Sequence, residues 1–305
     1  SKYSPYYGWN RFTDYPDKYD SWWGFETLPN VTETTPSYMD FILNEKNGVI
    51  RHWMENGASG WRLDVIDELP QQFSRSLYAA VKKIDADAVV IGEVWEDASN
   101  KISYDVSREY LCGYDMDAAM NYPFRTIVIE FLLNRISVQK TEALLNSQKE
   151  NYPIQNYYAM MNLLGSHDVE RIITILGEAP SADNMTAMAQ AHYRLDAEHY
   201  KLGQQRSMLA ALWQFTFPGV PSIYYGDEIG MQGFRDPHNR APYDWDNPDR
   251  IMQKWLEQLI KLRNNYPALQ AGELLFLHVS DDILAYARRI RDKQDVFGQP
   301  CADDI

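Results

Sequence analysis

Residues 57–70 read GASGWRLDVIDELP and place a charge pair, Arg62 and Asp64, inside a short apolar run. A buried parallel strand ordinarily carries valine, isoleucine and leucine at such positions. Residues two apart on a strand project from the same face, so we expect the guanidinium and the carboxylate to lie together. Two interpretations follow: a buried ion pair with a structural role, or a cation that keeps Asp64 ionised for chemistry.

This segment opens a strand-helix-strand unit. Residues 60–66, GWRLDVI, are a short strand candidate. Residues 69–87 carry apolar side chains at helical spacing, and residues 88–94, AVVIGEV, are rich in the β-branched residues typical of a buried parallel strand. The unit indicates a parallel sheet that is covered by helices.

The alternation of strands and helices continues on both sides of this unit. Residues 36–57 predict one helix that ends at the Asn56-Gly57 pair. Further strand candidates are residues 115–124, 160–164 and 220–228, and further helices are residues 125–136, 204–217 and 249–265. The last helix carries one apolar face, made of Ile251, Trp255, Leu259 and Leu262. Both an open doubly wound sheet and a (β/α) barrel have this order of elements.

Polar residues at the strand ends distinguish the two folds. Asp64, Glu93, the His167-Asp168 pair and the Asp227-Glu228 pair each follow a different strand candidate. All strand ends of a barrel open onto one mouth, whereas an open sheet brings together only the ends near its switch point. Four such ends therefore favour a (β/α)8 TIM barrel of the α/β class.

The last part of the chain has a different pattern. Residues 273–290, ELLFLHVSDDILAYARRI, alternate with a period of two around a turn at Ser280, Asp281 and Asp282, as in a β hairpin. We therefore expect three parts. Residues 1–35 precede the first predicted helix, residues 36–271 form the barrel, and residues 272–305 begin a C-terminal antiparallel β domain.

Composition excludes several classes of function. The 305 residues carry 29 basic and 43 acidic side chains, a net charge of -14, with no basic cluster for a nucleic-acid backbone. No apolar run approaches the ~18 residues of a membrane span. Cys112 and Cys301 lack the spacing of metal ligands, so no metal site is expected, and the lack of a disulfide pattern favours a cytoplasmic location. A secreted location stays open, because a removed signal peptide leaves no trace.

The strand ends also carry a defined chemistry. Glu93 closes an apolar strand with Trp95 two residues beyond, and a carboxyl group between apolar and aromatic walls can hold a proton near neutrality. A carboxylate, Asp64, that faces a carboxylic acid, Glu93, meets the requirement of glycoside hydrolysis. His167 and Asp168 add a third carboxylate, although such a pair is also common as a structural hydrogen-bonded couple.

Four segments resemble signature sequences of the α-amylase family of glycoside hydrolases. They are GWRLDV, IGEVWED, LLGSHDVERI and PGVPSIYYGDEIGM, in this order along the chain. A fifth segment, YDSWWGFETLPNV, is similar to the stretch between the third strand and its helix in the branch of neopullulanases, cyclomaltodextrinases and maltogenic amylases. The resemblance covers nearly the whole chain and implies the TIM-barrel fold.

The resemblance implies a role for each strand-end residue. Asp64 matches the nucleophile, Glu93 the general acid/base, and Asp168 the third carboxylate, which grips sugar hydroxyls. Arg62 and His167 match residues that keep the nucleophile ionised and bind hydroxyls of the cleaved sugar. The remaining substrate-binding positions are Asp236 and Arg240 in FRDPHNRAP, toward the nonreducing side, and Trp95 and Glu68 on the acceptor side.

One family signature has no counterpart here. Family members carry an Asp and an Asn-His pair at the end of the third strand, and the sequence begins just after the point where these should lie. The resemblance therefore implies an incomplete barrel, strands 4–8 with their helices, with residues 1–35 as the remainder of the excursion after strand 3. Five strands cannot close a barrel. We expect either a fragment of a longer enzyme or edges covered by a partner chain, such as the second copy of a homodimer.

The function implied by the resemblance is a retaining hydrolase of α-1,4-glucosidic bonds in starch-like glucans, maltooligosaccharides or cyclodextrins. This expectation applies to the parent enzyme rather than to this chain alone. The alternatives are a transglycosylase or an α-1,6-acting debranching enzyme on the same scaffold, and a noncatalytic carbohydrate-binding relative. An α-glucan is the expected partner. No cofactor is assigned to this chain. Calcium is a candidate cofactor for a full-length parent, since the family's usual calcium site draws ligands from the missing segment.

Overall fold

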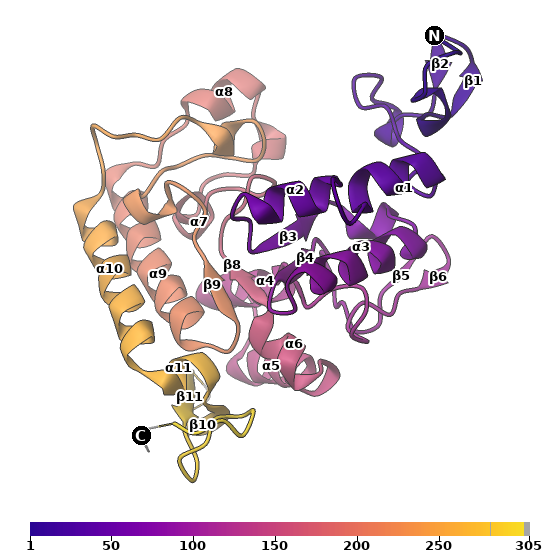
Figure 1. Cartoon of the computed structure of the whole chain (residues 1–305). Coiled ribbons are helices and arrows are strands. Elements are labelled where there is room, and N and C mark those ends of the chain that lie inside the picture. Colours follow the sequence, from indigo (N-terminus) through magenta and orange to yellow (C-terminus); the bar gives the residue numbers. More distant parts are fainter. Residues whose placement is uncertain (281, 302–305) are drawn as a thin grey trace. The chain divides into compact units, whose positions relative to one another are not determined.

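The computed structural model describes residues 1–280 and 282–301 (Figure 1). Asp281, in the predicted hairpin turn, and residues 302–305, at the end of the predicted C-terminal domain, lie outside the described residues. The chain forms two compact units. The first unit comprises residues 1–94 and 98–119, and the second unit comprises residues 95–97 and 120–305.

The first unit is built on a three-stranded parallel sheet. Strand β3 (Gly60–Leu63) pairs with β4 (Val89–Gly92), which pairs with β7 (Ala118–Ala119). The register places Arg62 opposite Ile91. The two strands approach closely at Gly60, where a Cβ atom would lie 2.2 Å from the carbonyl oxygen of Val89. The predicted strand-helix-strand unit is thus confirmed.

Helix α3 (Gln71–Ile84) connects β3 to β4. It buries Phe73, Leu77 and Val81, which share one side of the helix at the predicted spacing. The other elements of the first unit are the 3-10 helices η1 (Tyr7–Trp9), η2 (Trp22–Gly24) and η3 (Ile66–Glu68), and two antiparallel pairs, β1 (Phe12–Asp14) with β2 (Lys18–Tyr19) and β5 (Ile102–Ser103) with β6 (Val106–Ser107).

The single helix predicted over residues 36–57 is wrong, because the structure has two helices there. They are α1 (Pro36–Leu43) and α2 (Val49–Glu55). Between them, the Asn44 side chain accepts a hydrogen bond from the N–H of Lys46 at 2.9 Å, and the Asn44 carbonyl accepts one from the N–H of Gly48 at 2.9 Å. Asparagine side chains compete with helical backbone bonds in this way. The turn therefore interrupts a segment whose apolar residues alone look continuous.

The second unit carries two parallel strands and a set of helices. Strand β8 (Met161–Leu163) pairs with β9 (Val220–Ser222), and Met120 adds a parallel bridge to Met161. The helices are α4 (Tyr122–Leu132), α5 (Val138–Asn151), α6 (Ile154–Ala159), α7 (Ile172–Leu176), α8 (Ala187–His192), α9 (Ala197–Thr216), α10 (Arg250–Asn265) and α11 (Pro267–Ala271), with the 3-10 helices η4 (Ala182–Asn184), η5 (Asp227–Ile229) and η6 (His238–Arg240). In Figure 1, α9 and α10 run side by side.

Of the strand predicted over residues 115–124, only β7 (Ala118–Ala119) forms, because α4 begins at Tyr122. The Asn121 side chain caps this helix by accepting a hydrogen bond from the N–H of Phe124 at 3.2 Å. Pro123 fits the first turn, where a backbone N–H has no helical partner. An N-terminal cap that sequence reasoning did not weigh therefore ends the strand early.

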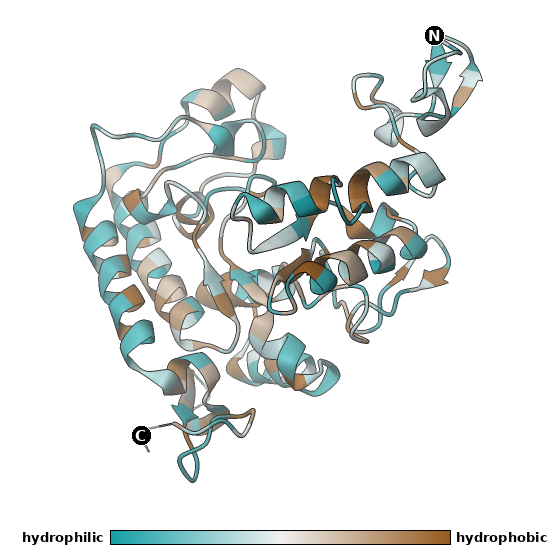
Figure 2. Cartoon of the chain, viewed as in Figure 1, coloured by the Kyte–Doolittle hydropathy of each residue, from teal (hydrophilic) through white to brown (hydrophobic). Residues whose placement is uncertain are grey.

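Helix α10 differs from prediction at its first turn. Leu259 is buried as expected, and Trp255 and Leu262 pack against the same cluster. Ile251, however, is 60% exposed, and the next residue, Met252, is buried instead against residues of α7 and of the segment before α9. Figure 2 shows α10 as hydrophilic over most of its visible side, as expected of a helix with one buried face.

The residues after α11 form the predicted antiparallel hairpin. Strand β10 (Glu273–Ser280) pairs with β11 (Ile283–Arg289), with Leu275 opposite Ala287. The hairpin belongs to the second unit. The predicted division into residues 1–35, 36–271 and 272–305 stays a prediction. None of the described helices is long and apolar enough to cross a lipid bilayer.

Candidate active site

In the first unit, Arg62 contacts both predicted catalytic carboxylates. Its Nη1 atom donates to Oδ1 of Asp64, and its Nη2 atom lies 2.9 Å from Oε2 of Glu93. The Asp64 side chain is 77% exposed, whereas that of Glu93 is 5% exposed. The expected contact between Arg62 and Asp64 is confirmed, but the strand predicted over residues 60–66 ends at Leu63, and Asp64 lies in the turn that follows. The guanidinium also reaches Glu93, at the end of the neighbouring strand.

The backbone turns sharply directly after Asp64. Val65 has a φ of 40° and a ψ of 57°, which is the left-handed region. This region is unfavourable for a β-branched residue, at a cost of about 1–3 kcal/mol. The turned backbone directs the N–H of Val65 to Oε2 of Glu93 at 2.8 Å. The strained turn therefore fixes the end of β3 to the end of β4.

Glu68 follows this turn and is held by two aromatic side chains. Its Oε1 atom accepts hydrogen bonds from Nε1 of Trp23 at 2.6 Å and from the hydroxyl of Tyr104 at 3.2 Å. Burial, together with the Glu68 carboxylate, raises the pKa of the Tyr104 hydroxyl, which therefore stays a donor. The two aromatic residues come from loops far apart in the sequence, and nothing in the local pattern predicted them.

In the second unit, four predicted site residues form one cluster. Nε2 of His167 lies 3.1 Å from Oδ2 of Asp168. Nη2 of Arg240 lies 3.5 Å from Oδ1 of Asp168, and Nε of Arg240 lies 3.0 Å from Oδ1 of Asp236. Asp168 therefore has a histidine on one oxygen and an arginine on the other. Hydroxyl groups of a ligand can bind to such a set of donors and acceptors.

Asn239 supports this cluster and was missed by sequence reasoning. The side chain is fully buried, and its Nδ2 atom donates to the carbonyl oxygens of Ser166 (3.2 Å), His167 (2.8 Å) and Val169 (2.8 Å). The loop that carries Asp168 is thereby tied to η6. An asparagine one residue before Arg240 looks like an ordinary turn residue in the sequence, and no local signal marks its burial.

Trp95 is joined to the same cluster through packing. Its ring stacks on that of Tyr122, with centroids 4.0 Å apart and an interplanar angle of 6°. The Tyr122 hydroxyl lies 3.2 Å from Oγ of Ser166, which accepts a hydrogen bond from the N–H of Asp168 at 3.1 Å. Trp95 is 45% exposed. Nearly half of this residue is therefore exposed, while the stacking on Tyr122 holds its ring in place.

The fourth predicted strand-end carboxylate, Asp227, has a buried partner; it lies in η5, because the strand predicted over residues 220–228 ends at Ser222. Asp227 lies against Arg171, which is 1% exposed, with Nη1 of Arg171 3.1 Å from Oδ1 of Asp227. Burial raises the pKa of Asp227 to about 6, although Arg171 opposes this shift. A Cβ atom on Gly165 would lie 2.2 Å from Oδ2 of Asp227, so any larger residue there would force the Asp227 side chain to move. Asp227 therefore supports the loop after β8 from inside the unit.

The predicted site residues thus gather in two groups. Arg62, Asp64 and Glu93 contact one another in the first unit, where Glu68 lies apart among aromatic rings. His167, Asp168, Asp236 and Arg240, with Trp95, lie in the second unit. Among the residues that the structure describes, no group of three or more His, Cys, Asp and Glu side chains is arranged to hold a metal ion.

Comparison with known proteins gives consistent matches. The model of the family "Alpha amylase, catalytic domain" matches residues 11–270. An amylopullulanase of Thermoanaerobacter thermohydrosulfuricus is 34% identical over 326 residues, covering 99% of this chain and 21% of that protein. Neopullulanase 2 of Thermoactinomyces vulgaris is 32% identical over 302 residues, covering 95% of this chain and 45% of that protein.

A solved structure matches as well. The ligand-free cyclic alpha-maltosyl-(1→6)-maltose hydrolase of Arthrobacter globiformis superimposes with a TM-score of 0.80 at 25% identity, covering 96% of this chain and 60% of that chain. This chain therefore spans less than half the length of the two relatives above and about three fifths of the solved neighbour.

Proposed function

This chain belongs to the alpha-amylase catalytic-domain family, as its signature segments predict, and we propose that it is part of a retaining glycoside hydrolase. The proposed substrates are the α-1,4-glucosidic bonds of starch-like glucans, maltooligosaccharides or cyclodextrins. The names of the relatives, an amylopullulanase and a neopullulanase, support an α-glucan substrate. Family membership also supports assigning β3, β4, β7, β8 and β9 to the last five strands of a (β/α)8 barrel.

The observation that carries the proposal is the bridge formed by Arg62. One guanidinium contacts an exposed carboxylate, Asp64, and a buried one, Glu93. In retaining enzymes the two catalytic carboxyl groups lie roughly 5 to 5.5 Å apart, and in inverting enzymes roughly 6.5 to 9.5 Å apart. Because Asp64 and Glu93 contact the same guanidinium, the shorter separation is favoured here. The exposed member is accessible to a sugar, and the buried member is shielded from bulk water.

In the proposed first step, a carboxylate oxygen of Asp64 attacks the anomeric carbon. Glu93 donates its proton to the glycosidic oxygen as that bond breaks, so the leaving sugar departs with a hydroxyl group. The product of this step is a glycosyl ester on Asp64. In the second step, Glu93 takes a proton from water, the water oxygen attacks the anomeric carbon, and Asp64 leaves as a carboxylate. Two inversions give net retention.

The second-unit cluster has a binding role in this proposal. Asp168 accepts hydrogen bonds from sugar hydroxyls, while His167 and Arg240 hold its two oxygens and donate to the substrate. Asp236 orients Arg240 through their 3.0 Å contact. The exposed indole of Trp95 offers an apolar face to a sugar ring. The double displacement needs only carboxyl groups and water, so we propose no cofactor for it.

A second candidate is hydrolysis of α-1,6 bonds on the same scaffold. The observation that favours it is the name of the solved neighbour, whose substrate, a cyclic maltosyl-maltose, contains (1→6) linkages. Loops decide which acceptor oxygen meets Glu93, and the catalytic carboxylates serve both linkages. Transfer of the glycosyl group to another sugar instead of water is the third outcome of the same chemistry.

Product analysis separates these candidates. The purified 305-residue chain and the protein as its source expresses it are each incubated with maltotriose, pullulan and β-cyclodextrin. Glucose and maltose from maltotriose, with opening of the cyclodextrin, are the expected products. Maltotriose from pullulan indicates α-1,6 cleavage, and products longer than the substrate indicate transfer.

Two variants identify the carboxylate that acts. Asp64→Asn is expected to lower the hydrolysis rate at least about 10³-fold, whereas Asp87→Asn, an exposed carboxylate of the same unit, leaves it unchanged. Full activity of the Asp64→Asn variant would remove Asp64 from the proposed role. An absence of turnover in both protein forms on all three glucans would refute the proposed function.

A further inference from the structure

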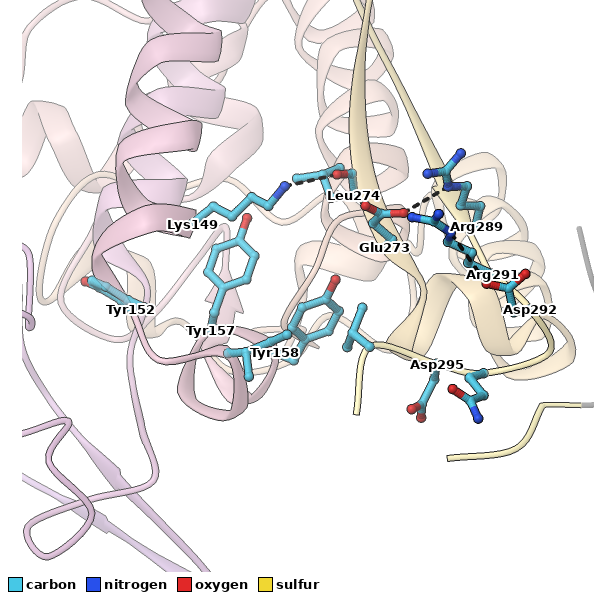
Figure 3. Close-up of a pocket in the computed structure, with 13 residues that line it drawn as sticks. Lys149, Tyr152, Tyr157, Tyr158, Glu273, Leu274, Arg289, Arg291, Asp292 and Asp295 are labelled. Atoms are coloured by element: carbon cyan, nitrogen blue, oxygen red, sulfur yellow. Dashed lines mark hydrogen bonds and ion pairs between the residues drawn. The ribbon is translucent and has the colours of Figure 1, made fainter. Parts of the chain in front are cut away.

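The second unit contains a cavity of about 580 Å³ that the proposed catalytic chemistry does not use (Figure 3). Its walls come from two segments far apart in the sequence, residues 149–158 of α5 and α6 and residues 273–296 of the hairpin region. Helix α6 leads directly into β8, so this wall precedes β8, whereas His167 and Asp168 follow it. The cavity is thus separate from the second-unit cluster along the chain.

Tyr157 places an unused hydroxyl group on the wall of this cavity. The residue is 3% exposed, and the hydroxyl has no hydrogen-bond partner among the described residues. In Figure 3 the ring directs this hydroxyl toward the end of the Lys149 side chain. Burial raises the pKa of Tyr157, so the group keeps its proton and stays a donor. An unpartnered buried hydroxyl is destabilising, and a ligand that accepts its hydrogen bond removes this cost.

The charges around the cavity balance. Three cationic side chains, Lys149, Arg289 and Arg291, face three carboxylates, Glu273, Asp292 and Asp295. Nε of Arg289 lies 2.9 Å from Oε2 of Glu273, and Nε of Arg291 lies 3.6 Å from Oδ2 of Asp292. A lining with a formal charge of zero gives no net attraction to an anion or a cation. Its many donors and acceptors instead suit a neutral ligand that carries several hydroxyl groups.

A second tyrosine gives the cavity a fixed aromatic wall. The hydroxyl of Tyr158 donates to the carbonyl oxygen of Gly272 at 2.7 Å, and its ring packs edge-on against Phe297 with centroids 5.6 Å apart. The guanidinium of Arg288 lies 5.6 Å from the ring centroid. Because three contacts hold this ring, it can present an apolar surface to the C–H groups of a sugar at low entropic cost.

We propose that this cavity is a carbohydrate-binding site that takes a neutral mono- or disaccharide, with the Tyr157 hydroxyl donating to the ligand. The volume lies within the roughly 300 to 1,000 Å³ of small-molecule pockets. Glu273 and Asp295 accept hydrogen bonds from sugar hydroxyls, and Lys149 donates one. The site lies outside the proposed catalytic residues and does not depend on them, so a chain without hydrolytic activity still tests it.

The test is a titration of the 305-residue chain with maltose, in which the backbone amide chemical shifts are monitored. The Asp64→Asn background prevents turnover. Maltose is expected to shift amides in both residues 149–158 and residues 273–296. Glucose 6-phosphate, which carries charge, is expected to bind there more weakly than glucose. No shift in either segment with maltose, or tighter binding of the phosphorylated sugar, would overturn the proposal.

Two tyrosine variants make the test specific. Tyr157→Phe removes one hydroxyl and is expected to weaken maltose binding in the cavity about two- to tenfold, the effect of one hydrogen bond. Tyr266→Phe removes an exposed hydroxyl outside the cavity and serves as the control. Tyr157→Phe should melt at the same temperature as the parent or higher, because its hydroxyl has no protein partner among the described residues. A lower melting temperature or unchanged maltose affinity would contradict the role of Tyr157.

Discussion

The Nη2 atom of Arg62 lies 2.9 Å from Oε2 of Glu93, and the same guanidinium contacts Asp64 through Nη1. One cation therefore sets the position of both carboxyl groups in the proposed double displacement. A planar guanidinium can make both contacts at once, and an ammonium group at the end of a flexible chain cannot hold the same geometry.

Arg62→Lys is therefore expected to lower kcat/KM on maltotriose roughly 10- to 100-fold, the loss of one charge-assisted hydrogen bond. Steady-state kinetics measure this effect. Arg51→Lys is the matched control, because Arg51 makes a 3.1 Å ion pair with Glu55 within α2 and is not one of the proposed site residues. Equal kcat/KM values for the two variants would show that the bridge has no catalytic importance.

Asn239 is expected to be a large contributor to the stability of the second unit. Replacement by alanine removes a donor to three carbonyl oxygens of the loop that carries Asp168 and leaves a void in a fully buried place. We expect Asn239→Ala to lower the free energy of unfolding by about 2–4 kcal/mol in urea titrations. Asn264→Ala, an exposed position in α10, should change it by less than about 0.5 kcal/mol. Similar losses of unfolding free energy in the two variants would contradict the inference that Asn239 stabilises the loop that carries Asp168.

The pair of Asp227 and Arg171 predicts a pH dependence of stability. The folded-state pKa of Asp227, about 6, lies above its ordinary value of 3.8 because burial disfavours the charge. At a pH between these two pKa values, Asp227 is protonated in the folded chain and has released its proton in the unfolded chain. The contribution of Asp227 to stability is therefore full below pH 4 and falls as the pH rises from about 4 to 6, by at most about 3 kcal/mol.

Urea titrations at a series of pH values measure this dependence. The difference in unfolding free energy between the parent and Asp227→Asn should fall across this pH window and stay level above it. A difference that rises with pH would mean that the ion pair with Arg171 outweighs burial, and that the folded-state pKa is depressed rather than raised.

Local patterns predicted the parts of the fold where hydrophobicity and charge repeat at short range. The strand that contains Arg62 and the helix with Phe73, Leu77 and Val81 follow from periods of two and about 3.6 residues. The spacing of two residues also predicted the contact between Arg62 and Asp64, although Asp64 lies in the turn just after β3. These features need no knowledge of the rest of the chain.

Other features depend on contacts between distant segments, and the sequence pattern did not predict them. Ile251 matches the apolar face of α10, but Met252 is the residue that meets a buried neighbour at the first turn. Asn44 ends α1 through hydrogen bonds that its own side chain and carbonyl accept. The partners of Asn239 lie about seventy residues earlier. Each depends on which groups meet after folding, so periodicity gives no sign of it.

The configuration of the first sugar released tests the retaining mechanism most directly. Proton NMR can follow the anomeric signals of the new reducing end during hydrolysis of maltotriose, before mutarotation mixes the two forms. If Asp64 forms a glycosyl ester and Glu93 then activates water, the α-anomer must be formed first, and Asp64→Asn must abolish its formation. Initial formation of the β-anomer would show a single displacement by water and would contradict the proposed roles of Asp64 and Glu93.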